Sequence, residues 1–178
     1  LPQEKRFSIW LGNPGMILYL VASALLILLL IGALAGSWMV SGVVPTLIYY
    51  GLKVIAPAIF LFATCLISCL ISLMTGSSWT TIATIGVALI GIGTAQGYAP
   101  GIIAGAIISG AYFGDKVSPL SETTIMAASS SGTPLFTHIR FLMYTTIPSI
   151  AIALVIFLIL SLTHDAPSVS EMGKFSEA

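Results

Sequence analysis

Long apolar runs separated by short polar interruptions make up most of this 178-residue chain. A membrane-spanning helix needs about 20 mainly apolar residues. The first run, residues 16–35, is rich in Leu, Ile and Ala, contains no charged residue and has about that length. Further apolar runs cover residues 54–74, 79–96, 101–114 and 141–162. The pattern therefore predicts an all-α integral membrane protein built from transmembrane helices.

The interruption at residues 75–81 holds one glycine, two serines and three threonines but no charged residue. Such a composition suits a turn buried at membrane depth, where hydroxyls and freed backbone carbonyls satisfy each other or hold an ion. We therefore expect residues 54–74 and 79–96 to form a re-entrant helical hairpin with this turn at its tip. Two complete spans joined by a short loop are the alternative.

A second interruption, at residues 115–124, predicts a broken helix. Pro119 has no amide proton and disfavours helical geometry at Ser118, so the helix should open there. Ser121 can then cap a second half-helix, which the Ser- and Gly-rich residues 129–134 end. Because this break carries charged groups, it is the expected site for ions or polar solutes.

Glycines occur in two pairs with four-residue spacing in the run before this break. The first pair is Gly101 and Gly105, and the second is Gly110 and Gly114. This spacing lets two membrane helices approach backbone to backbone. The run is therefore expected to pack closely against a neighbouring helix.

The first connection of the chain should kink or turn, because residues 36–45 contain two glycines and a proline. Trp38, Tyr49 and Tyr50 are the expected anchors at the membrane surface. Lys53 then marks a boundary that faces water.

Composition supports this class of protein. Hydrophobic residues make up 57% of the chain and charged residues only 7%, with a mean hydropathy of +1.08. A soluble domain carries about 25% charged residues. The net charge is zero and no basic cluster exists beyond Lys5-Arg6, so no nucleic-acid partner is expected. Cys65 and Cys69 are expected to be core residues of a membrane helix rather than metal ligands.

An enzyme is not predicted, because two histidines and two cysteines offer no nucleophile with a base and an orienting group. No cofactor is expected. His138 and Arg140 mark the membrane surface before the last run. Residues 1–162 are expected to form a single transmembrane transporter domain, followed by a polar tail at residues 163–178. Since the first residue is Leu rather than Met, we interpret the chain as a fragment or a processed product.

The chemistry of the two interruptions suits sodium, a hard cation that prefers oxygen ligands. Asp115 is the expected exchangeable carboxylate and sodium ligand, because a proton and a sodium ion compete for such a group. This competition yields antiport if only the loaded forms reorient. The other oxygens expected around the ion come from Ser77, Ser78, Thr80, Thr81, Ser118, Ser121, Glu122, Thr123 and Thr124.

Lys116 is the expected charge partner of this site. It is predicted either to pair with Glu122 across the break or to replace the cation in the empty state. An ion pair of Asp115 and Lys116 at a helix end is the alternative, and Glu122 is equally a ligand or a capping acid. We expect Asp115→Asn to abolish sodium-dependent proton movement, and Ser77→Ala mainly to weaken sodium affinity.

These residues resemble the NhaC family of sodium/proton antiporters. The resemblance runs from about residue 31 to the end of the last apolar run. Its most specific stretches are residues 34–50, 75–81, 110–124 and 136–140. The family pattern often has aspartate where this chain has Glu122, which weakens the assignment of that residue as a ligand.

The resemblance implies an ion-transporter fold of inverted repeats, each with a re-entrant hairpin and a broken helix. The hairpin tip would fall on residues 75–81 and the break on residues 115–124. Family members are longer and hold two repeats, so this chain would be one half of such a transporter. Its expected partners are the lipid bilayer and either the missing second repeat or further copies of itself. The expected location is the cell membrane, with several spans.

The function expected on these grounds is sodium/proton antiport, the secondary active transport of Na+ in exchange for H+. A malate/lactate (organic anion) antiporter of the same family type is an alternative. It is disfavoured because Asp115 and Glu122 would repel a dianion, and only Lys116 and Arg140 could attract one. A half-transporter fragment that does not transport is the other alternative.

Overall fold

The structure, a computed structural model, describes residues 14–163. Within them every regular element is a helix, which confirms the all-α expectation. The elements are α2 (Pro14–Val40), α3 (Val43–Val54), the 3-10 helix η1 (Pro57–Ile59), α4 (Phe60–Thr75), α5 (Ser78–Ala83), α6 (Ile85–Ala95), α7 (Pro100–Val117), α8 (Glu122–Ser130) and α9 (Leu135–Leu162).

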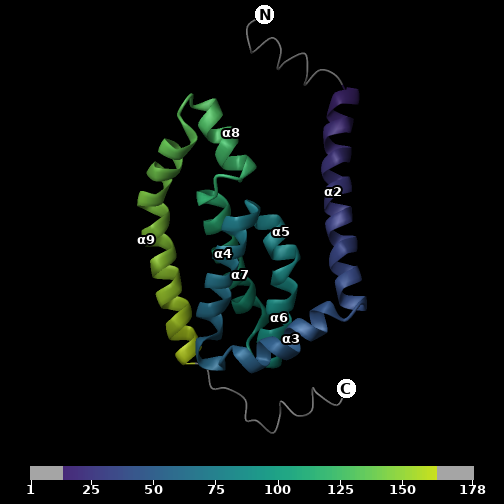
Figure 1. Ribbon diagram of the computed structural model, residues 1–178, viewed down its shortest axis with the longest axis vertical. Helices are drawn as coiled ribbons and strands as arrows, with labels where there is room; N and C mark the ends of the chain where they lie inside the picture. The colour runs from purple at the N-terminus through teal and green to yellow at the C-terminus, as the bar shows by residue number, and fades with distance from the viewer. Residues whose placement is uncertain (1–13, 164–178) are drawn as a thin grey trace, which may run out of the picture.

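The centre of the molecule is the pair α4 and α7, which lie side by side (Figure 1). Their backbones touch where α7 carries glycine. A Cβ atom at Gly114 would lie 2.5 Å from the Leu73 amide nitrogen and 2.6 Å from the Cys69 carbonyl oxygen. A Cβ atom at Gly110 would overlap the carbonyl oxygen of Cys65. This contact holds the end of α7, and with it the predicted site, against α4.

The remaining helices surround this pair. α9 packs along one side of α4 and α7, α6 packs on α7, and α3 crosses one end of the molecule against α6 (Figure 1). The apolar core near that end includes Phe60, Leu61, Ile103 and Ile107, all less than 2% exposed. The Phe60 ring stacks on Tyr98 with centroids 5.4 Å apart.

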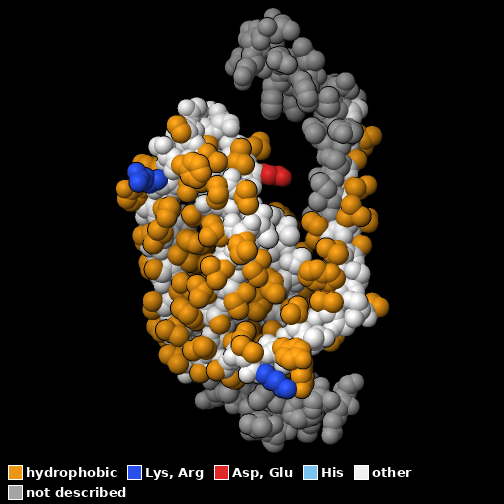
Figure 2. Space-filling model, viewed as in Figure 1, with side chains coloured by type: hydrophobic (Ala, Val, Ile, Leu, Met, Phe, Trp, Pro, Cys, Tyr) orange, Lys and Arg blue, Asp and Glu red, His pale blue; other side chains and the backbone are white. Residues whose placement is uncertain are grey.

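The outer surface is apolar, as a lipid-facing surface must be. Figure 2 shows hydrophobic side chains spread over the visible face, with basic side chains only near its two ends. In the described part of the chain, Pro57–Thr75 and Leu135–Leu162 are long and apolar enough to cross a membrane. A third span results if the bent pair α2–α3 is counted as one.

The expected kink between the first two segments is confirmed. Leu29–Val40 and Val43–Val54 meet at 67°, and Gly42 adopts the left-handed conformation with φ of 82°. The residues after the kink form the helix α3, which the sequence did not predict. Its Lys53 is exposed and donates from Nζ to the Tyr49 hydroxyl at 2.7 Å.

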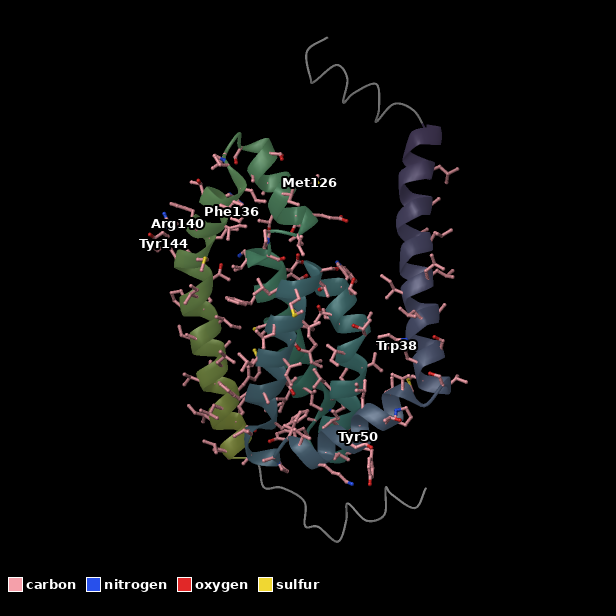
Figure 3. The ribbon with its side chains drawn as sticks, viewed as in Figure 1. Trp38, Tyr50, Met126, Phe136, Arg140 and Tyr144 are labelled. Atoms are coloured by element: carbon pink, nitrogen blue, oxygen red, sulfur yellow. The ribbon has the colours of Figure 1, made fainter. Side chains whose placement is uncertain are left out.

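Aromatic side chains lie toward both ends of the bundle. Trp38 and Tyr50 are near one end, and Phe136 and Tyr144 of α9 are near the other end, with the basic Arg140 beside Tyr144 (Figure 3). This placement fits the interfacial role predicted for Trp38 and Tyr50.

Several predicted segment boundaries differ from the structure. α2 ends at Val40 rather than at residue 35, and α7 ends at Val117 rather than at residue 114. The hairpin's first arm begins with η1 at Pro57 rather than at residue 54, because proline starts a new helical turn. Its second arm is broken at Thr84 into α5 and α6. The last helix begins at Leu135 instead of residue 141, since Pro134 precedes a helix well. His138 therefore lies inside α9. Lys5-Arg6 and residues 164–178 of the predicted tail lie outside the described residues.

Candidate functional site

The tip of the helical hairpin and the break of the second helix meet in the structure. α4 ends at Thr75, and Gly76 after it adopts a left-handed conformation with φ of 70°. α7 ends at Val117, and Ser118 continues in an extended conformation. A Cβ atom at Gly76 would lie 2.7 Å from the carbonyl carbon of Leu120. The two interruptions found in the sequence are thus in direct backbone contact.

Asp115 is held by one serine from each interruption. Ser78 donates from Oγ to Asp115 Oδ2 at 2.8 Å, and Ser121 donates from Oγ to Asp115 Oδ1 at 2.6 Å. Hydrogen bonds to an ionised acceptor are short and strong. Both oxygens of the carboxylate are therefore engaged by neutral hydroxyls, which turn readily from donor to ligand.

The start of α8 places further oxygens next to this carboxylate. Ser121 caps α8 by accepting from the Thr124 amide at 3.5 Å. Its hydroxyl also lies 2.9 Å from Thr123 Oγ1. Thr124 donates from Oγ1 to the carbonyl of Lys116 at 3.2 Å, so it joins α8 to the end of α7. Thr123 thus lies next to Ser121, which holds the Asp115 carboxylate. Thr124 instead bonds the backbone of α7.

The other hydroxyls of the hairpin tip bond within the tip. Ser77 caps α5 by accepting from the Thr80 amide at 3.3 Å, and it also accepts from Thr80 Oγ1 at 3.1 Å. Thr81 donates to the Ser77 carbonyl at 2.9 Å. Ser77 and Thr80 line a cavity that Asp115 also lines, and Ser78 is the tip residue that donates to its carboxylate.

Two cavities meet at Asp115. One, of about 600 Å³, lies between α5, α7, α8 and α9, and Lys116 lines it. The other, of about 520 Å³, lies between α2, the hairpin tip and α8, and Glu122 lines it. Trp79 and Thr123 line both cavities, as Asp115 does. Asp115 therefore borders both cavities.

The predicted pairing of Lys116 with Glu122 is not formed. The two side chains lie in different cavities, and within the described residues no ion pair joins them. Both side chains are exposed. The arrangement gives one cavity a positive charge beside Asp115 and gives the other a second negative charge.

Three hydroxyl residues at the larger cavity were missed by the sequence analysis. Ser109 reaches it from α7, and Thr146 and Ser149 reach it from α9. Ser109 lies seven residues before Lys116, which places both on one face of a helix. This spacing could have indicated from the sequence that Ser109 faces the same cavity as Lys116. For α9, the hydroxyl residues within the apolar run at residues 141–162 were a weaker signal.

Fold and site together define a class of protein. It is an all-α membrane protein in which a helical hairpin and a broken helix meet at one carboxylate, the arrangement of an ion or polar-solute transporter. Within residues 14–163, no three His, Cys, Asp or Glu side chains form a metal-binding group. The site is thus built from one acid and several hydroxyls.

The chain belongs to the Na+/H+ antiporter family, which it matches over residues 13–162. It is 53% identical to the Na(+)/H(+) antiporter NhaC of Alkalihalophilus pseudofirmus over 134 residues, which are 75% of this chain and 29% of that protein. This result confirms the family expected from the sequence.

Two further relatives carry other names. The chain is 47% identical to the Malate-2H(+)/Na(+)-lactate antiporter of Bacillus subtilis, over 82% of this chain and 31% of that protein. It is 41% identical to the Arginine/ornithine antiporter ArcD of Halobacterium salinarum, over 78% of this chain and 29% of that protein. The chain therefore spans about a third of the length of these curated relatives. No solved structure matches it.

Proposed function

We propose that this protein takes part in the exchange of Na+ for H+ across the cell membrane, with Asp115 as the carboxylate that the two ions share. The observation that carries the proposal is the double clamp on Asp115. Ser78 from the hairpin tip holds one carboxylate oxygen and Ser121 from the helix break holds the other. Membership of the Na+/H+ antiporter family supports the choice of ions.

The clamp suits an ion that must lose its water. When Na+ arrives, the Ser78 and Ser121 hydroxyls turn their lone pairs to the cation, and Asp115 neutralises its charge. When H+ arrives instead, the protonated carboxyl is also neutral. The empty carboxylate is charged, and a charge at membrane depth costs at least about 2.5 kcal/mol. Reorientation is thus favoured only for the loaded forms, which gives exchange.

The activity belongs to a larger assembly in this proposal. The chain spans about a third of its relatives' length, and the site opens into two cavities. A second repeat or further copies of the chain would complete the ligand shell. The complete protein would cross the cell membrane several times, with the hairpin tip of this chain at membrane depth.

An organic-anion exchanger is the second candidate. The larger cavity carries Lys116 and hydroxyls, and Glu122 lies in the other cavity. Because Glu122 lies in the other cavity, it would repel an anion in the larger cavity less than the sequence suggested. The Bacillus relative is named for malate and lactate. Asp115 still lines the larger cavity, so Na+/H+ exchange remains the preferred function.

The test is sodium-driven proton movement in proteoliposomes, with the protein expressed from its complete open reading frame. We expect Asp115→Asn to reduce exchange to the level of liposomes without protein, because the amide cannot release a proton or neutralise Na+. Lys53→Gln is the control, since it removes a charge from the distant helix α3 and should leave exchange unchanged.

Normal exchange by the Asp115→Asn protein would overturn the proposed role of this carboxylate. If no variant moves protons in response to Na+ but malate or lactate drives uptake, the organic-anion exchanger replaces the antiporter.

A further inference from the structure

The hairpin tip and the broken helix are joined at one point besides the Asp115 clamp. Ser118 donates from Oγ to the carbonyl of Leu73 in α4 at 2.8 Å. The same hydroxyl accepts from the Leu120 amide at 3.2 Å. Ser118 is 0% exposed. Its proton and one of its lone pairs are thus already used by the backbone on both sides of the contact.

The partner of Ser118 is a carbonyl that the end of α4 leaves without its usual partner. A continued helix would bond the Leu73 carbonyl to the Ser77 amide. Here that amide donates to the hydroxyl of Thr75 at 3.4 Å instead. Because an unpaired carbonyl is costly in a membrane protein, Ser118 stabilises the end of α4 while it ties α4 to the break.

Backbone contact reinforces this link. Gly76 follows the end of α4 in the left-handed conformation, and a Cβ atom on it would lie 2.8 Å from the Leu120 carbonyl oxygen. Ser118, the Leu73 carbonyl, Leu120 and Gly76 therefore form one connection between the two interruptions, which we call the latch.

We propose that Ser118 is a positioning residue, and that the latch fixes the distance between Ser78 and Asp115. This proposal rests on the proposed function and refines it. On the sequence alone Ser118 was expected to be an ion ligand, whereas here it holds the residues that bind the ion in place. The geometry explains how the latch would act. Leu73 lies five residues before Ser78, and Ser118 lies three residues after Asp115. Separating α4 from the break therefore moves one clamp serine away from the carboxylate.

The latch also makes the hairpin tip and the break move together. Each of the two clamp serines belongs to a different interruption, so the ion site keeps its shape only if both interruptions move as a unit. Loss of the latch should loosen the site for Na+ without removing any group that binds it.

The experiment compares Ser118→Ala with Ser161→Ala in the protein from the complete reading frame. Ser161 is a matched control: it is also 0% exposed, and its hydroxyl donates to the carbonyl of Pro57 at 3.1 Å at the opposite end of the bundle. Both variants lose a buried hydroxyl that bonds a carbonyl of another element.

We expect Ser118→Ala to raise the KM for Na+ about tenfold, with a maximal rate within about twofold of the parent. The substitution removes a buried hydrogen bond and leaves the Leu73 carbonyl without a donor. The ratio of Na+ to Li+ affinity should change as well. Ser161→Ala should lower thermal stability to a similar extent and leave the KM and this ratio unchanged. Gly76→Ala should repeat the KM effect of Ser118→Ala.

Unchanged KM and ion selectivity in a folded Ser118→Ala protein would overturn the proposal, as would an equal KM change in Ser161→Ala. If Ser118→Ala does not fold, Ser118→Cys is measured by the same criterion, because the thiol is a weaker donor of similar size. Normal exchange in Asp115→Asn would contradict the proposed function itself, which separates the two failures.

Discussion

Two neighbouring serines at the hairpin tip make different hydrogen bonds, although the sequence assigned both to the ion. α5 begins at Ser78. Ser77 therefore sits at the cap position and bonds the Thr80 amide, whereas Ser78 bonds the Asp115 carboxylate. The sequence predicted a polar tip beside a charged break. It did not predict which serine reaches the acid, because that depends on the residue at which α5 begins.

A pair of substitutions tests this distinction. Ser78→Ala should raise the KM for Na+ about tenfold, because the hydroxyl bonds a charged group directly. Ser77→Ala, which on the sequence alone was expected to weaken Na+ affinity, should instead cost about 1 kcal/mol of stability through loss of the helix cap. Sodium-dependent exchange and thermal unfolding measure the two effects. A larger KM change in Ser77→Ala than in Ser78→Ala would show that Ser77, rather than Ser78, contacts the Asp115 carboxylate.

At the scale of elements, the long helices followed from the apolar runs, but α3 and the close packing did not. The sequence marked both glycine pairs of α7 as contact points. In the structure a Cβ atom at Gly105 would have nothing within 4 Å, whereas one at Gly114 would meet the backbone of α4. Spacing within one helix identifies a face, and only the fold of the partner decides which turn of that face touches it. The start of the hairpin at Pro57 was missed because this proline lies within an apolar run. The start of α9 after Pro134 was missed because His138 and Arg140 were taken to mark the membrane surface before the last run.

The two glycines provide a matched pair of variants. Gly114→Ala should destabilise the protein by about 1–3 kcal/mol, since the added methyl group is forced against α4. Gly105→Ala, in the same helix, should be neutral or stabilise by up to about 1 kcal/mol, because alanine favours a helix more than glycine does. Thermal unfolding in detergent measures both. Equal loss of stability in the two variants would contradict the close contact of α4 and α7.

At the scale of the whole molecule, the hydrogen bonds around Asp115 link fewer oxygens than the roughly six or more that a hard cation such as Ca²⁺ takes. Around Asp115 the structure brings together two carboxylate oxygens and the hydroxyls of Ser78, Ser121 and Thr123. The two cavities beside Asp115 leave room for the rest. Water, a second repeat or another copy of the chain would have to supply them.

This shortfall predicts how the 178-residue chain behaves alone. Reconstituted without further sequence, it should insert into liposomes, since its surface is apolar, but it should exchange Na+ for H+ at less than about a tenth of the rate of the protein from the complete reading frame, as expected for an incomplete ligand shell. Rates per molecule in the same lipid measure this, and Asp115→Asn in both forms gives the background. Equal rates from monomers of the short chain would show that water completes the shell, and activity confined to its oligomers would show that a second copy does.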